Sequence, residues 1–167
     1  MNSSDKIISE FLIHISEEKG FSKHTIAAYK YDLNCFLSFL MEYDTNIAMD
    51  LNKVDRSCIR HFLAKELENA LSSKTTARRL ASIKSFFKYL KQTGKVEDNP
   101  SIHVKTPKVE KKIPTFIQEN KINELMNMPD RTTMIGKRDH AMLELFYATG
   151  IRLSELVGLN IGSVDHS

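Results

Sequence analysis

The feature that most constrains the fold is a helical spacing of apolar residues, repeated in four successive stretches of the N-terminal part of the chain. This spacing places one face of a helix toward a core, whereas a half-buried strand would alternate every second residue. Ser22, Asp55 and Ser72 stand where helix N-caps are expected. Gly20 and Gly94 stand where helices stop. The sequence therefore predicts helices over 5–19, 22–43, 55–67 and 74–93, with these residues inward: Ile8, Phe11, Leu12, Ile15, Ile26, Tyr29, Leu33, Phe36, Leu37, Leu40, Ile59, Phe62, Leu63, Leu67, Leu80, Ile83, Phe87 and Leu90.

The composition suits a globular, mainly α protein. The 167 residues are 41% hydrophobic, which allows one large domain or one domain plus part of another. No apolar run reaches membrane-spanning length and the N-terminus lacks a signal pattern, so we expect a cytoplasmic protein with no membrane partner. Cys35 and Cys58 have no partners at metal-ligand spacing and are expected to be buried small hydrophobes. We expect neither a metal nor a cofactor.

The fourth predicted helix carries the clearest sign of a partner, because no acidic residue lies between Ser72 and Lys95. A solvated helix face normally mixes signs, and a face of one sign repels itself unless an anion such as a phosphate backbone lies against it. The helix is therefore predicted to face nucleic acid, and a merely solvated basic face stays open as the alternative. The net charge of +3 adds little, because the distribution of charge matters more than its sum.

After Gly94 the apolar periodicity ends, and Pro100, Pro107 and Pro114 appear among several lysines. This composition predicts an extended linker over 98–114, between a first domain over 1–97 and a second over 115–167. Two roles stay open for the linker, which are not exclusive. Its lysines can track phosphates as two lobes close around a duplex, or it can serve as a plain tether.

The second domain is predicted to begin with helices over 118–128 and 137–149 and to enter a strand over 160–165. Gly150 suits a helix end with positive φ. Arg152 then stands at the start of a short helix, where backbone N–H groups and the helix dipole favour an oxyanion such as phosphate. Glu155 lies three residues on and can hold the guanidinium in one orientation. On spacing alone, an ordinary surface ion pair remains the commoner interpretation.

The residues from Ala148 to Leu159, ATGIRLSELVGL, resemble the first catalytic box of the tyrosine recombinases, the phage-integrase superfamily, and most closely its Xer branch. Ser22 to Leu33 resembles the opening of the family's N-terminal DNA-binding domain. Asn99-Pro100 and Thr106-Pro107-Lys108 resemble the joint between its two domains. Gln118 departs slightly, since family members often have Ser or Thr as the cap there.

The resemblance implies a four-helix SAM-like core-binding domain, a linker, and the first helices of an α+β catalytic domain. It implies that the second and fourth helices cross in the major groove of a double-stranded recombination site. Arg152 would bind the scissile phosphate with support from Glu155, in a homo- or hetero-tetramer of recombinase subunits. The residues placed to contact DNA are Lys23, His24, Thr25, Lys30, Lys74, Thr75, Arg78, Arg79 and Ser82.

The rest of the family's catalytic set does not carry over. Tyrosine recombinases cleave with a Tyr nucleophile and leave a 3′-phosphotyrosyl link, and they also use a His-x-x-Arg box. No His here is followed by Arg three residues later, and Tyr147 is the last Tyr and precedes Arg152. We therefore predict that a polypeptide of these 167 residues binds DNA without cleaving it, as the first half or so of a recombinase that resolves chromosome dimers or moves an integrative element.

Two other interpretations stay open. One is a naturally short protein that occupies a recombination site and modulates a full-length enzyme, and whether the reading frame continues past Ser167 would separate it from the first. The other is a helical protein-interaction module, which would make the basic helix a coincidence. Without the rest of the sheet of the second domain, the helices from Gln118 onward lack much of their packing surface, so we expect them to be held less firmly than the first four.

Overall fold

The computed structural model describes residues 3–110, 116–160 and 162, with side chains described from residue 6 onward. The chain forms two compact units, Met1–Lys111 and Lys112–Ser167. Within the described ranges every regular element is a helix, which confirms the predicted mainly α fold.

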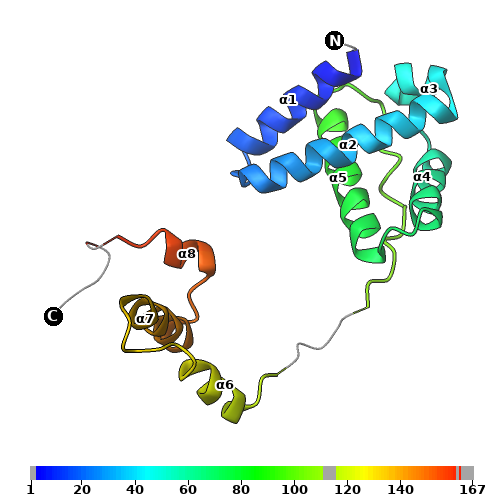
Figure 1. Cartoon of the computed structure of the whole chain (residues 1–167). Helices are drawn as coiled ribbons and strands as arrows, with labels where there is room; N and C mark the ends of the chain where they lie inside the picture. The colour runs from blue at the N-terminus through cyan, green and yellow to red at the C-terminus, as the bar shows by residue number, and fades with distance from the viewer. Residues whose placement is uncertain (1–2, 111–115, 161, 163–167) are drawn as a thin grey trace. The chain divides into compact units, whose positions relative to one another are not determined.

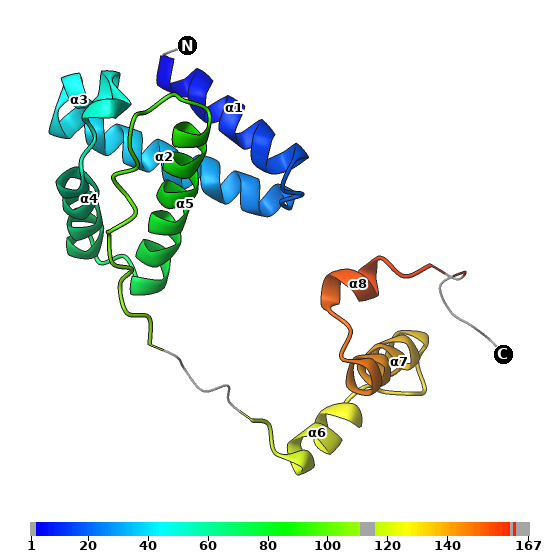
Figure 2. The same ribbon diagram turned by 180° about the vertical axis from the view of Figure 1, so that it is seen from behind.

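The first unit contains four long helices, α1 (Ser3–Glu17), α2 (Lys23–Tyr43), α4 (Arg56–Glu68) and α5 (Ser73–Gln92). Figures 1 and 2 show α2 and α5 crossing, with α1 and α4 packed beside them. Between α2 and α4, where the sequence predicted no helix, the chain forms the short helix α3 (Thr45–Met49) and the 3-10 turn η1 (Leu51–Lys53). Asp44 and Asp50 cap these turns, each accepting a backbone N–H two residues on.

The predicted helix boundaries hold because local hydrogen bonds set them. Ser22 accepts the backbone N–H of Thr25 at 3.2 Å, and Ser72 accepts that of Thr75 at 3.2 Å. Asp55 accepts the N–H of Cys58 at 2.8 Å. After α1 and α5 the chain passes through Gly20 at φ +63° and Gly94 at φ +68°, a region where side chains are strained.

The core of the first unit is the face that the spacing predicted, filled mostly by aromatic and aliphatic side chains. Phe36 packs edge-on against Phe62 and Phe87, with ring centroids 5.2 and 6.4 Å apart. Among the predicted inward residues, Leu67 was wrong, since it is 45% exposed. Phe39 and Phe86 are buried and were not predicted. Tyr29 is half-buried against Phe11 and Phe21, and burial followed by nearby Asp32 raises the pKa of its hydroxyl, which fits a core role.

The segment that follows α5 belongs to the packing of the first unit for part of its length. Val96, Ser101 and Val104 are buried, and the backbone N–H of Glu97 donates to the Asn52 side chain at 3.0 Å. In Figure 2 this segment turns back and runs down between α4 and α5. The predicted linker begins at residue 98, whereas the compact unit continues to Lys111.

The second unit contains α6 (Glu119–Met126), α7 (Met134–Thr149) and α8 (Leu153–Val157). Gln118 precedes α6 without a side-chain cap bond, and α7 starts before the predicted residue because Thr133 accepts the N–H of Gly136. Within the described part of this unit only Gly136 is buried. Most of the predicted strand over 160–165 falls outside the described residues.

The described ranges contain neither a membrane-spanning helix nor a metal site. No helix there combines the length and apolarity needed to cross a bilayer. In the same ranges no cluster of His, Cys, Asp and Glu side chains is arranged to hold a metal ion.

Candidate nucleic-acid interface

The N-terminal halves of α2 and α5 expose some of the side chains that were predicted to contact DNA. Lys23, His24 and Lys30 are exposed on α2, and Lys74 is exposed on α5. Both helices begin with the same local arrangement, because the Thr25 and Thr75 hydroxyls lie 2.9 and 3.0 Å from the hydroxyls of their capping serines. These two threonines are half-buried, so their hydroxyls help to fix the helix starts that carry the exposed lysines.

Arg78 is partly exposed and has a fixed partner. Its Nη1 donates to Oδ2 of Asp32 at 2.5 Å, and 42% of its side chain remains accessible. Asp32 comes from α2 and is fully buried. The ion pair therefore links the two helices that carry most of the predicted contacts.

The structure corrects the placement of Arg79 and Ser82, which the sequence put on the exposed side of α5. Both are buried. The Arg79 guanidinium donates to the Glu66 carboxylate on α4, and Ser82 donates to Oδ2 of Asp32 at 2.8 Å. Acidic groups from α2 and α4 thus reach a helix that has none of its own, which the local sequence could not indicate.

Ion pairs with residues outside α5 also neutralise the C-terminal end of the basic stretch. Lys91 pairs with Asp98 at 2.7 Å, and Lys95 pairs with Glu10. The hydrogen bond from Lys95 lowers the pKa of Glu10, while the bond from Lys91 lowers that of Asp98. On α5, Lys74, Lys84 and Lys88 have no ion-pair partner among the described residues, and these three form the free basic row of the helix.

Sequence reasoning missed two residues of α2 that lie against side chains of α5. Asp32 was noted only as part of a motif, although its buried carboxylate binds Arg78 and Ser82. Tyr31 is exposed on α2, and the guanidinium carbon of Arg79 lies 5.6 Å from its ring centroid. Tyr31 falls outside the predicted apolar face of the helix, and this was the available signal for its exposure.

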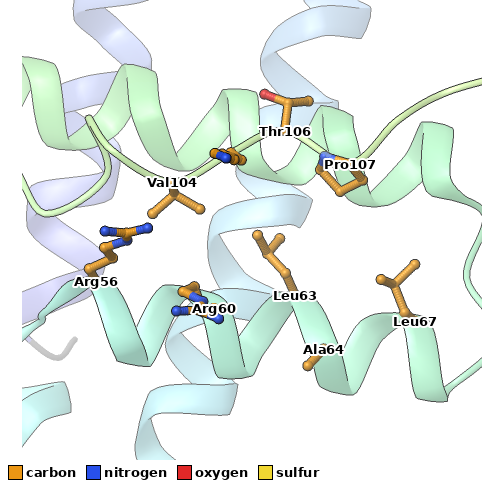
Figure 3. A pocket seen from close by; sticks show the side chains of 9 residues that line it. Arg56, Arg60, Leu63, Ala64, Leu67, Val104, Thr106 and Pro107 are labelled. Atoms are coloured by element: carbon orange, nitrogen blue, oxygen red, sulfur yellow. The ribbon is translucent and has the colours of Figure 1, made fainter.

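A separate groove of about 560 Å³ lies between α4 and residues 104–107. Figure 3 shows Val104 and Leu63 approaching each other across it, with Arg56 and Arg60 at one end. Its apolar floor also includes Leu67, which explains how a residue predicted to be inward remains accessible. None of the predicted site residues lines this groove.

Arg152 and Glu155 adopt the predicted contact at the start of α8. Gly150 ends α7 at φ +64°, and Arg152 is the N-cap of the next helix. One oxygen of Glu155 accepts the Arg152 backbone N–H at 2.8 Å, and the other accepts Nη1 at 3.1 Å. The Arg152 side chain is 81% exposed, so the rest of its guanidinium is accessible to an anion.

Comparison with known proteins identifies both units. A family model described as "Phage integrase, N-terminal SAM-like domain" matches residues 8–94, and one described as "Phage integrase family" matches residues 115–167. A protein named tyrosine recombinase XerC from Herpetosiphon aurantiacus is 40% identical over 159 residues, which cover 95% of this chain and 51% of that protein. Tyrosine recombinase XerC from Pelotomaculum thermopropionicum is 38% identical over 164 residues, covering 96% of this chain and 53% of its own length.

A third relative, named tyrosine recombinase XerD, comes from Listeria monocytogenes and is 37% identical over 155 residues, covering 93% of this chain and 52% of that protein. The chain thus spans about half the length of the curated relatives it matches. The predicted resemblance is confirmed over both units, and the chain belongs to the phage integrase family.

Proposed function

We propose that this chain supplies the DNA-binding domain, and the first phosphate-binding arginine, of a site-specific tyrosine recombinase. The observation that carries the proposal is the free basic row on α5, Lys74, Lys84 and Lys88, on a helix that packs across α2, where Lys23 and Lys30 are exposed. The acidic side chains that contact the first half of α5, Asp32 and Glu66, are buried and pair with Arg78 and Arg79. The relatives' names, tyrosine recombinases XerC and XerD, agree with this function.

In this proposal α2 and α5 lie against the major groove of a duplex. Lys23, Lys30 and Lys74 neutralise phosphates, which sets the position of the domain on the duplex without reading its sequence. Arg78 combines a planar fork of donors with partial exposure, so it is the candidate for contact with a base edge. Arg79 and Ser82, buried beneath this surface, act through their contacts with Glu66 and Asp32.

Arg152 is proposed to bind the scissile phosphate. Its accessible guanidinium can bind a phosphate oxygen and stabilise charge that develops on it, while Glu155 fixes its orientation. The Tyr nucleophile and the His-x-x-Arg box of the family are not found in these 167 residues. A polypeptide of this sequence is therefore expected to bind a recombination site and to form no covalent adduct with it.

The proposed partners are a double-stranded recombination site and further recombinase subunits, alike or different, in a tetramer that acts on DNA in the cytoplasm. Tetrameric assembly follows from the family resemblance. A naturally short modulator of the same site would bind DNA in the same way, and the reading frame beyond Ser167 separates the two proposals.

The test is a salt series of binding measurements. Duplexes bound by the wild-type chain are selected from a pool with a randomised core, and affinity is then measured for the best selected duplex and for a scrambled one. Steep loss of affinity with salt, together with tighter binding of the selected duplex, supports the proposal.

A matched pair of variants locates the interface. Lys74→Ala should lower the salt slope by about one, because one phosphate contact is lost. Lys53→Ala removes the same charge from η1 and should leave the slope unchanged. Equal slopes for the two variants, or wild-type affinity that does not depend on salt, would refute the placement of DNA on α2 and α5.

A further inference from the structure

The Asp32 carboxylate occupies an unusual position for an acid in a DNA-binding domain. It is fully buried, yet it ties α2 to α5 through residues one turn apart, Arg78 and Ser82. A buried carboxylate is costly unless it is paired and hydrogen-bonded. Oδ2 of Asp32 accepts from one charged and one neutral donor, whereas Oδ1 is buried without a hydrogen-bond partner, 3.8 Å from Nε of Arg79. Both donors come from α5, so the carboxylate fixes how the two helices meet.

Asp32 pairs mainly with Arg78, because the neighbouring Arg79 has its own partner. Arg79 is engaged by Glu66 from α4, and its Nε lies 3.8 Å from Oδ1 of Asp32 with no hydrogen-bond partner. Glu66 therefore compensates most of the charge of Arg79. The short contact of Asp32 is to Nη1 of Arg78, at 2.5 Å.

The contact with Asp32 holds only one corner of the Arg78 guanidinium. A guanidinium carries its N–H donors in a planar fork, so fixing Nη1 on a buried carboxylate also fixes the plane of the whole group. The side chain remains 42% accessible. Arg78 therefore presents a pre-oriented edge beside the free basic row, and such an edge matches two acceptors of a guanine in the major groove.

The negative charge of Asp32 allows its effect on the orientation of Arg78 to be distinguished from its effect on the general attraction to DNA. A negative charge beneath a DNA-binding surface weakens the pull on phosphates, so Asp32 lowers general attraction to any duplex. Its contribution to binding must come from geometry. Removing the charge should then have opposite effects on general attraction and on sequence discrimination.

We propose that Asp32 is a positioning residue for DNA recognition, which orients Arg78 for contact with a base edge rather than with phosphate. This inference rests on the proposed function, because it requires α2 and α5 to lie against DNA. In this proposal Asp32 does not contact DNA, but it sets the base selectivity of Arg78, which does.

The test compares affinity for the selected duplex with affinity for the scrambled duplex, using the full chain. Asp32→Asn keeps the shape and removes the charge, and it should lower this ratio about tenfold, within the discrimination that one bidentate arginine provides. Its affinity for the scrambled duplex should hold or rise, since the net charge increases. Glu42→Gln makes the same charge change at an exposed position of α2 and should leave the ratio unchanged.

A second variant keeps the proposal testable if Asp32→Asn folds poorly, as judged by helical circular dichroism. Arg78→Lys retains a charge that can pair with Asp32 but loses the fork, and it should also lower the ratio about tenfold. Because Asp32 acts through Arg78, the double variant should lose no more discrimination than Arg78→Lys alone.

The outcomes separate the inference from the function on which it rests. A wild-type ratio for folded Asp32→Asn, a wild-type ratio for Arg78→Lys, or additive losses in the double variant would overturn the positioning role alone. Equal losses on both duplexes with a lower salt slope would mean a phosphate contact and would also overturn it. Wild-type chain that does not discriminate between the duplexes would overturn the proposed function and the inference with it.

Discussion

Replacing Glu66 with Ala should destabilise the first unit far more than an ordinary surface substitution. In the folded chain the Glu66 carboxylate accepts a hydrogen bond from Arg79, and their side chains are only 11% and 8% exposed. Glu66→Ala leaves the guanidinium buried without its main partner. The sequence alone placed Arg79 among the DNA contacts, so this perturbation also tests the correction made by the structure.

The size of the effect follows from burial. Removing one partner of a buried ion pair costs about 3–5 kcal/mol, because the remaining charge stays dehydrated. Asp32 Oδ1 lies 3.8 Å from Arg79 Nε and keeps part of the compensation, so the lower end applies, about 3 kcal/mol. With a urea slope of about 1.5 kcal/mol/M, the unfolding midpoint should fall by about 2 M.

The assay is urea unfolding followed by far-ultraviolet circular dichroism. Glu42→Ala is the matched control, because Glu42 also forms an ion pair, with Lys65, but its side chain is 67% exposed. It should change stability by about 0.5 kcal/mol or less. Glu66→Gln keeps the shape of the side chain without its charge, and its loss of stability should lie between those of Glu66→Ala and Glu42→Ala.

Equal midpoints for Glu66→Ala and Glu42→Ala would refute the reasoning, since they would show that Arg79 finds water or another partner without cost. In that case Arg79 would return to the set of accessible cations, and its assignment as a DNA contact would regain support.

Three further predictions concern other parts of the chain. Asp55→Ala should cost about 1 kcal/mol in urea unfolding, whereas Asp55→Asn keeps the cap of α4. The hydrogen bond from the Cys58 backbone N–H lowers the pKa of Asp55 in the folded chain. The stabilisation that the ionised Asp55 carboxylate provides is therefore complete above about pH 4 and is lost as the pH falls through its lowered folded pKa. The free energy of unfolding measured against pH should show this loss in the wild-type chain and not in Asp55→Asn. Gly136→Ala would place its Cβ 1.9 Å from the Asp130 carbonyl oxygen and should destabilise the start of α7 by about 1–3 kcal/mol, seen as faster amide exchange there and not in α5. In the wild-type chain, amides of α7 should exchange much faster than those of α5, because α5 contributes many fully buried side chains while the described second unit buries only Gly136; equal protection would contradict this.

Much of the fold could be predicted because its determinants are local. Ser22, Asp55 and Ser72 each cap a helix through a backbone N–H three residues away, and the core faces of α2 and α5 follow the helical period. The short helix α3 was missed, although Asp44 gave a capping signal, because five residues carry too little periodicity to distinguish a helix from a connection.

The candidate site was predicted in part. The exposure of Lys74 and the contact between Arg152 and Glu155 depend on position along one helix, so the sequence was a good guide to both. The burial of Arg79 depends on Glu66, and that of Ser82 on Asp32, residues that approach α5 only after the helices pack.

By itself, the sequence determined the long helices, their caps, most of the core and the family box around Arg152, since each depends on hydrogen bonds or spacing within a few residues. Tertiary structure decided which cations of the basic stretch are free. Asp32, Glu66 and Glu10 neutralise Arg78, Arg79 and Lys95 from 46, 13 and 85 residues away. Ion pairing depends on distance in space, and a buried position removes water as a competing partner, so the charge presented to DNA is a property of the packed helices and not of the α5 sequence.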